Sequence, residues 1–533
     1  MDGSRRDARM SRQTRRFSRR RVLRGLAGAG LAPLVLSAKA PAAADPLATF
    51  DHIVVLMLEN RSFDNLLGYL YQPGTVPRGQ HFEGVAGKNL SNPIPAGADQ
   101  ASRGVVAVAP GTVPEAPNPD PGEGYPHVNA ELYGAFIPPA NRDKDAQAMM
   151  APYNAPTPLP AVAPMDGFVT DYIAQLARVN GREPTYAEYR QIMDCFPAGY
   201  LPTLTALAKD FAVCDHWYCA VPSQTFCNRS FFHAASSSGL VLNAPYVHWV
   251  TANTAETIFD RIDAAKDPAL TWKVYYDPQD IYSLTALIHF QRLQHALTTN
   301  FFPMDRFLED ARSGQLPSYC FIEPRLLINH NDMHPPTNVL PGDALIHQVY
   351  EAIRTAASPT GSNWRNTLLV ITFDEHGGCY DHVPPPAAVP PDPGAPPREM
   401  GFRFDRLGVR VPTILVSAYV EPGTVVSTPL DHATMLKTIE TKWGLAPLTG
   451  RDRAARDLGF ALTRTGPRPV AEWPVTTPPA TDAAASNLDQ PPNGLQRDVV
   501  GLAMAAAGQR GAVAEGMTVR DAVRAMERVR TPR

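Results

Sequence analysis

Short apolar runs alternate with helical patterns along much of this chain. Three runs are continuous stretches of apolar and β-branched side chains, which is typical of parallel strands buried on both faces. They cover residues 51–58, 368–373 and 411–417, and a weaker one covers 318–322. Apolar residues at helical spacing occupy residues 201–211, 343–356 and 431–443. Strands that alternate with helices predict an α/β fold, in which helices cover both faces of a mostly parallel central sheet.

Proline divides the remainder of the chain. Its 54 residues lie largely within 72–164, 384–397 and 467–492. Residues 72–164 form a long Pro/Gly-rich stretch with little periodicity, and a loop of that length inside a domain is usually functional. We therefore predict one large domain over residues 45–466 with a cap insertion at about 72–164, a Pro/Ala-rich linker over 467–497 and a helical tail over 498–533.

The first 44 residues have the pattern of an export signal. A basic region at 18–24 precedes a short apolar run, and small residues that suit a signal peptidase end at Ala40 or Ala44. The paired arginines before Val22 resemble a twin-arginine signal. A basic nucleic-acid-binding arm would leave the apolar run and the cleavage site unexplained. We therefore expect export by the twin-arginine machinery, to the periplasm or the medium.

Removal of this signal changes the charge of the chain. The signal carries 11 of the 49 Lys and Arg residues and 2 of the 52 Asp and Glu residues, so the mature chain has a net charge of −12. An acidic protein of this kind binds polyanions poorly, which argues against DNA or RNA as a partner. The apolar run is also shorter than the roughly 20 residues that a membrane span needs, so no transmembrane segment is expected.

The six cysteines leave two interpretations open. An even number in an exported protein permits disulfides, and four of the six lie within residues 195–227. Buried free thiols explain the same residues equally well.

Oxygen-bearing side chains follow two of the predicted strands directly. Glu59 and Asn60 follow the first strand, and Asp374 and Glu375 follow the strand at 368–373. Consecutive carboxylates at the end of an apolar strand repel each other and resist burial unless a cation compensates their charge. Each pair alone could simply cap the next helix. The two pairs together predict a site for a divalent metal ion at one edge of the sheet.

The longer motifs around these residues resemble a known family. ENRSFDNLLGY at residues 59–69 and FDEHGGCYDHVPPP at residues 373–386 are similar to motifs of the bacterial phospholipase C and acid phosphatase family. The resemblance extends from about residue 52 to residue 445. It implies an alkaline-phosphatase-like fold and makes residues 45–466 a phosphoesterase catalytic domain. It also implies the same four metal ligands, Glu59, Asn60, Asp374 and Glu375.

The resemblance further implies a threonine nucleophile. The family pattern, Thr followed by any residue, Pro, Asn and Arg, matches Thr225 in PSQTFCNR, although Cys227 replaces the proline. Ser223 remains an alternative nucleophile. A metal contact would lower the pKa of the Thr225 hydroxyl, which is otherwise a weak nucleophile, and attack on phosphorus would give a phospho-threonine intermediate. Asn228 and Arg229 would then steady the oxygens of the transferred phosphoryl group.

Histidines supply the expected proton donor to the leaving group. By the resemblance, His127 in PGEGYPHVN and His334 in NDMHPP are the candidates. His289 is a weaker match that could belong to the core, and His382 could equally orient its own loop.

Three functions remain possible on these residues. The expected one is phospholipase C action on a phosphodiester such as phosphatidylcholine, so that phospholipid is a possible substrate. The second is acid phosphatase action on phosphomonoesters, which needs the same nucleophile and metal. The third is a non-catalytic exported binding module with a degenerate site. Sulfatase and serine hydrolase motifs (C-x-P-x-R and G-x-S-x-G) do not occur in the sequence.

Overall fold

The computed structural model describes residues 45–481, 487–509 and 516–530. The predicted export signal at residues 1–44 lies outside the described residues. Within them, no helix is both long and apolar enough to cross a membrane.

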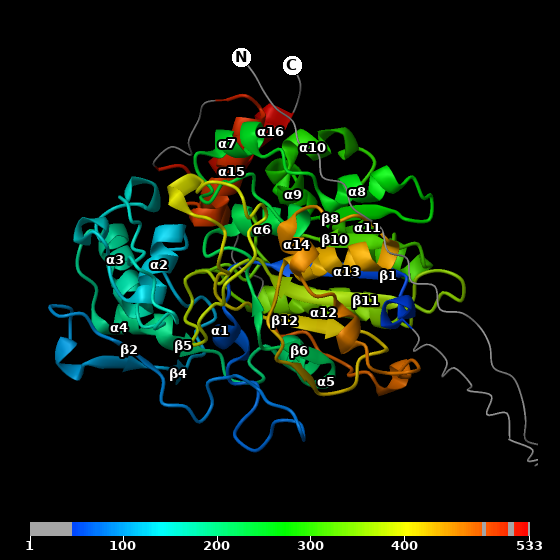
Figure 1. Cartoon of the computed structure of the whole chain (residues 1–533), viewed down its shortest axis with the longest axis horizontal. Helices are drawn as coiled ribbons and strands as arrows, with labels where there is room; N and C mark the ends of the chain where they lie inside the picture. The colour runs from blue at the N-terminus through cyan, green and yellow to red at the C-terminus, as the bar shows by residue number, and fades with distance from the viewer. Residues whose placement is uncertain (1–44, 482–486, 510–515, 531–533) are drawn as a thin grey trace, which may run out of the picture. The chain divides into compact units, whose positions relative to one another are not determined.

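A central sheet of eight strands organises the domain (Figure 1). The predicted strands at 51–58, 318–322 and 368–373 are confirmed as β1 (His52–Leu58), β10 (Tyr319–Ile322) and β11 (Thr367–Phe373). In order across the sheet, the strands are β13 (Thr424–Val426), β6 (Ala212–Cys214), β12 (Thr413–Val416), β11, β1, β10, β8 (Trp272–Tyr276) and β9 (Phe301–Pro303). Every residue of β11 is buried, so both faces of the sheet are covered as predicted.

The sheet is mostly parallel, with one reversed strand. β1 runs parallel to β10 and β11, β8 runs parallel to β10 and β9, and β13 runs parallel to β6. β12 is antiparallel to both of its neighbours, so the prediction of a parallel strand at 411–417 is wrong. Residues 374–412 contain no α-helix that could carry the chain back across the sheet, and β12 therefore starts at the edge where β11 ends.

The three predicted helices are also present. They are α5 (Pro202–Asp210), α12 (Leu340–Arg354) and α13 (Ala433–Trp443). α12 packs against α5, β1 and β11, while α13 packs against α6 (Thr225–Ala234). Phe232 of α6 contacts Phe321 of β10, so α6 lies directly on the sheet.

The insertion at residues 72–164 shares a hydrophobic cluster with the segment that follows it, residues 165–195. It contains strands β2 (Ser91–Pro93), β3 (Val105–Ala107) and β4 (Ala109–Pro110) and helix α2 (Tyr125–Tyr133), drawn in blue and cyan in Figure 1. α2 packs against α3 (Phe168–Asn180), which follows the insertion. The stretch before α2 reaches the carboxyl edge of the sheet, where Asn60 contacts Glu123.

The segment predicted as a linker, residues 467–497, is instead partly built into the domain. Arg468 and Trp473 are buried, and the Trp473 ring packs against Phe211 and Tyr350. Two helices follow, α15 (Gly494–Ala506) and α16 (Val519–Arg530), so α15 begins before the predicted tail. α15 packs against α7 (Tyr246–Ala252) and α9 (Leu284–Ile288). This stretch packs against the domain because its apolar side chains find apolar partners there.

All six cysteines are buried free thiols. The structure therefore agrees with the interpretation of the cysteines as buried free thiols.

Candidate active site

The two acidic strand ends meet because their strands are neighbours. Leu58 and Phe373 are paired across β1 and β11, which run parallel, so the residues that follow them emerge at the same edge. The Asn60 amide N–H donates to Asp374 Oδ1 at 3.0 Å, and Asn60 Nδ2 donates to Glu375 Oε1 at 2.7 Å. Glu59, Asn60, Asp374 and Glu375 are all buried. The structure thus brings together all four predicted metal ligands.

Thr225 lies beside this group at the first residue of α6. Its hydroxyl donates to Glu59 Oε2 and to Asn60 Oδ1, both at 3.3 Å. The hydroxyl of Ser223, the alternative nucleophile, donates to the Val241 carbonyl at 2.7 Å. Of the two hydroxyls, the structure therefore places that of Thr225 against the acidic strand ends.

Asn228 and Arg229 make contacts within the protein that the sequence did not predict. The Asn228 side chain bonds to the backbone of Val221, Ser223 and Gln224, so it shapes the loop before Thr225 and has no group left for a substrate. Arg229 is buried, forms an ion pair with Glu59 and lies 3.7 Å from Asp374 Oδ2. Both residues therefore contact protein groups around Thr225, while Arg229 Nε and Nη1 have no hydrogen-bond partner, and their contact with phosphoryl oxygens stays a prediction.

The charge of the site fits a divalent cation. Burial raises the pKa of Glu59 well above its ordinary value, and Arg229 offsets this only in part while Asp374 adds to it. Burial, together with the Glu123 carboxylate, raises the pKa of Glu375 to about 8. Asp374 Oδ2 is buried without a hydrogen-bond partner. Carboxylate and amide oxygens that lack sufficient positive charge are the donor set that hard divalent ions take.

The cap insertion adds two carboxylates that the sequence analysis missed. Asp120 and Glu123 lie with His334 close enough for all three to hold one metal ion. Glu123 Oε1 accepts from Asn60 Nδ2 at 2.6 Å and lies 3.3 Å from His334 Nε2, so this group adjoins the strand ends. The only sequence signal is the pair of acidic residues just before His127.

Both predicted proton donors lie near the site. Burial disfavours a charged His334, but Asp120 and Glu123 more than offset this, so the pKa of His334 lies well above its ordinary value. His127 Nδ1 is 2.9 Å from Asp171 Oδ1. The His127 side chain lines a cavity of about 550 Å³ together with Glu123 and Gln224, the residue that precedes Thr225.

The two weaker histidines have structural roles. His289 is buried, and neither ring nitrogen has a hydrogen-bond partner; burial lowers its pKa to about 3. His382 bonds to Asp64 and Glu83. A histidine that the sequence analysis did not single out, His376, lies 3.3 Å from Glu375 Oε2 and 2.8 Å from Glu131 Oε2, and so orients a predicted ligand.

An ion-pair network supports the loop behind Glu375. Arg410 Nη2 donates to Asp64 Oδ1 at 2.8 Å, and Arg410 Nε donates to Asp381 Oδ1 at 2.9 Å. The remaining Arg410 nitrogen donates to the carbonyls of Glu83 and Asp215. All three charged side chains are fully buried. Because Arg410 pairs with both Asp64 and Asp381, and His382 also pairs with Asp64, we interpret this group as structural.

Replacement of Arg410 by methionine is expected to lower the free energy of unfolding by about 3–5 kcal/mol, because two buried carboxylates lose their partner. Urea denaturation followed by circular dichroism measures this loss. The matched control is Arg464→Met, which breaks a more exposed pair with Glu421 and should cost at most about 1 kcal/mol. Equal losses in the two variants would contradict a structural role for Arg410.

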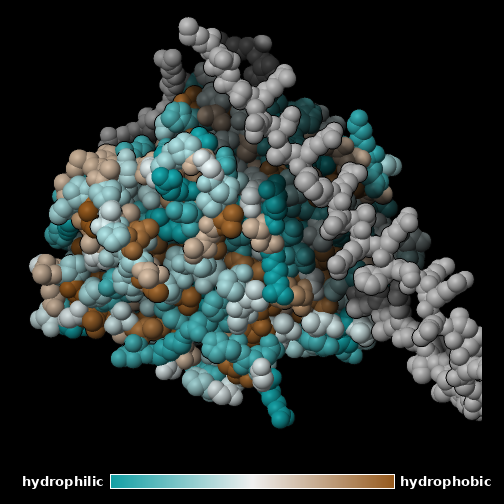
Figure 2. Space-filling model, viewed as in Figure 1, coloured by the Kyte–Doolittle hydropathy of each residue, from teal (hydrophilic) through white to brown (hydrophobic). Residues whose placement is uncertain are grey.

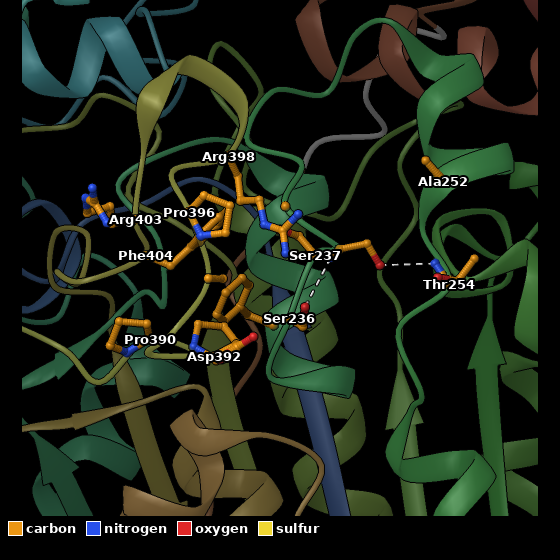
Figure 3. A pocket seen from close by; sticks show the side chains of 15 residues that line it. Ser236, Ser237, Ala252, Thr254, Pro390, Asp392, Pro396, Arg398, Arg403 and Phe404 are labelled. Atoms are coloured by element: carbon orange, nitrogen blue, oxygen red, sulfur yellow. Dashed lines mark hydrogen bonds between the residues drawn. The ribbon is translucent and has the colours of Figure 1, made fainter. Parts of the chain in front are cut away.

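A second cavity, of about 320 Å³, lies beyond the C-terminal end of α6 (Figure 3). Ser237, Arg398 and Phe404 are among the residues that line it. None of the predicted site residues lines it, so the chemistry of the strand ends belongs with the larger cavity.

Comparison with known proteins shows the family of this chain. The model of the Phosphoesterase family matches residues 50–446. Non-specific phospholipase C3 of Arabidopsis thaliana is 31% identical over 82% of this chain and 76% of its own length, and non-specific phospholipase C4 is 32% identical over 80% and 74%. Phospholipase C A of Mycobacterium tuberculosis is 27% identical over 80% of this chain and 81% of its own length. Among solved structures, the phosphonate monoester hydrolase of Agrobacterium radiobacter aligns with a TM-score of 0.28 at 11% identity, over 49% of this chain and 72% of its own.

Proposed function

Because the chain belongs to the phosphoesterase family and is an ester-bond hydrolase, we propose that it is an exported, metal-dependent phospholipase C that acts through Thr225. One observation carries the proposal: the Thr225 hydroxyl bonds to Glu59 and Asn60 at the point where the two acidic strand ends meet. The proposal of export rests on the twin-arginine-like pattern before residue 45.

In this mechanism the Thr225 Oγ1 atom attacks phosphorus. Glu59, Asn60, Asp374 and Glu375 would hold a divalent cation, which would lower the pKa of the Thr225 hydroxyl and balance charge on the phosphoryl oxygens. The bond from phosphorus to the diacylglycerol oxygen breaks as the bond to Oγ1 forms. His334 or His127 gives a proton to the departing oxygen. Water then attacks phosphorus and releases Thr225 with the phosphorylated headgroup.

The cavity beside Thr225 favours a diester with a cationic headgroup over a monoester. Its lining includes the carboxylates of Asp120, Glu123, Asp145 and Asp498, against the guanidinium groups of Arg178 and Arg497. A phosphomonoester near neutral pH carries close to two negative charges, whereas phosphocholine esters are neutral overall. Excess carboxylate at the entrance therefore repels the first kind of substrate more strongly than the second.

A phospholipid must also reach this cavity from a lipid surface. Figure 2 shows hydrophobic side chains in small separate groups among hydrophilic ones on the face that it draws. That pattern suits dispersed or micellar lipid, reached by short-lived contact with its surface.

The substrate class is tested with the purified protein and two chromogenic esters. We expect p-nitrophenyl phosphorylcholine to be hydrolysed with a kcat/KM at least about tenfold above that for p-nitrophenyl phosphate, because a difference of close to two charges at a buried site is worth more than the roughly 1.4 kcal/mol that corresponds to a factor of ten. The reverse preference would indicate an acid phosphatase. Hydrolysis of neither ester would indicate a binding module.

A further inference from the structure

The helix α15, near the C-terminus, is linked through Asn243 to the turn that carries the proposed nucleophile. Asp498, in the second turn of α15, accepts a hydrogen bond from Asn243 Nδ2 at 2.6 Å and another from the Tyr246 hydroxyl at 2.7 Å. Asn243 lies in the loop before α7, far from α15 in the sequence. The contact therefore joins the tail to the catalytic domain through a defined polar pair, in addition to the apolar packing of α15 on α7.

Asn243 in turn holds the first residues of α6. It is 2% exposed, and its Oδ1 accepts from the Phe226 amide N–H at 3.0 Å. The backbone N–H of Asn243 donates to Gln224 Oε1 at 3.1 Å. The residue at the N-cap of α6, Gln224, makes no capping bond with its own side chain. Asn243 thus supplies the acceptor that a cap residue usually provides, for the amide next to Thr225.

The chemistry of the Asp498 side chain decides how Asn243 is oriented. An asparagine side chain has one accepting and one donating end, and the two are nearly equal in shape. An ionised carboxylate only accepts, so Asp498 selects the orientation in which Nδ2 points to α15 and Oδ1 points to Phe226. With the ends exchanged, an NH₂ group would face the Phe226 N–H, and the first turn of α6 would lose its acceptor.

We propose that Asp498 is a positioning residue for phosphoryl transfer, which fixes the orientation of Asn243 and thereby the place of the Thr225 hydroxyl. This role rests on the proposed function of Thr225 as nucleophile. Residues 491–498 also line the cavity of about 550 Å³, so the tail contributes both a wall of the substrate site and a support for the nucleophile.

A side-chain exchange tests the orientation directly. Asp498→Leu leaves Asn243 Nδ2 without its acceptor, and Asn243→Asp places two carboxylates together, so each single variant should lose about tenfold in kcat, the scale of a small misplacement of a reacting group. KM should stay within about twofold. The double variant Asn243→Asp/Asp498→Asn restores every donor–acceptor pair, including the bond from Phe226 N–H, and should recover kcat to within about threefold of the wild type.

Hydrogen exchange supplies a measurement that does not depend on activity. Peptides that cover residues 221–231 should exchange faster in both single variants, because the side chain at position 243 is no longer held against the Phe226 amide, and should be protected again in the double variant. The matched control is Asp489→Asn, which removes an exposed carboxylate of the same tail, paired with Arg520. It should leave both kcat and exchange unchanged.

The outcomes separate this proposal from the proposed function. Wild-type kcat and wild-type exchange in Asp498→Leu would overturn the positioning role, as would a double variant no better than Asn243→Asp. A rise in KM with kcat unchanged would reduce Asp498 to a part of the cavity wall and also overturn it. A wild-type protein inactive on both esters would refute the proposed function, and hydrogen exchange would then still decide whether Asp498 orders the α6 turn.

Discussion

The Thr225→Ala variant is expected to lose phosphoesterase turnover by a factor on the order of 10⁴ or more, the scale seen when a covalent nucleophile is removed. No other described hydroxyl among the predicted nucleophiles reaches Glu59 and Asn60, so the attacking oxygen has no substitute. The fold should persist, because the hydrogen bonds lost are long, at 3.3 Å. Steady-state kinetics on p-nitrophenyl phosphorylcholine and thermal unfolding measure the two effects.

Two further variants serve as controls for this prediction. Thr225→Ser keeps the hydroxyl and should retain turnover within about tenfold of the wild type, because the nucleophilic atom is preserved. Ser223→Ala removes the alternative nucleophile, whose hydroxyl bonds to Val241, and should also remain active. If Ser223→Ala were inactive and Thr225→Ala active, the assignment of the nucleophile would be wrong.

The second large effect is expected from Asp374→Asn. The substitution keeps the shape of the side chain and an acceptor for the Asn60 and Glu375 amides, but it removes a negative charge from the predicted ligand set. We expect metal affinity to fall by about 100-fold or more and kcat/KM to fall with it, because second-shell changes alone cost about 10–100-fold. Metal content after dialysis, measured by elemental analysis, and turnover against metal concentration provide the test.

Chelation gives this second prediction an independent readout. A ligand that binds only the folded state stabilises it, so EDTA should lower the thermal midpoint of the wild type and have little effect on Asp374→Asn. The control is Asp343→Asn, a buried aspartate that caps α5 through the Thr203 and Leu204 amides and lies outside the predicted ligand set. It should retain metal despite reduced stability. A wild type without bound metal, unaffected by EDTA, would contradict the metal assignment.

The strand ends and the Arg410 network both bury several carboxylates, but they differ in how the negative charge is compensated. Burial of several carboxylates is costly unless positive charge compensates it. At Asp64 and Asp381 the chain supplies its own guanidinium, with hydrogen bonds to both carboxylates. At the strand ends, three carboxylates (Glu59, Asp374 and Glu375) face Arg229 and His376, and Asp374 Oδ2 remains without a hydrogen-bond partner. The protein's own positive charges compensate Asp64 and Asp381 better than they compensate the strand ends. We therefore place the metal ion at the strand ends.

The sequence predicted that the two acidic strand ends meet, because this prediction depends mainly on local sequence pattern. An apolar run long enough to be a buried strand determines where its polar end begins, and two parallel neighbours must bring such ends to one edge. Glu59 and Asp374 therefore meet as expected. Short strands such as β6, β9 and β13, of three residues each, carry too little pattern to be recognised.

What the sequence by itself determined is the position of β1 and β11 and of their acidic ends, because periodicity is a property of neighbouring residues; the choice of Thr225 as nucleophile came from the family resemblance and stays a prediction. Only the tertiary structure decided the reversed direction of β12, the arrival of Glu123 and Asp120 from the cap, and the engagement of Asn228 and Arg229 within the protein. It also decided the contact of Asp498 with Asn243. Each of these features depends on which segments, distant in the sequence, pack against each other. Hydrogen bonds between such segments produce no periodic pattern in the sequence.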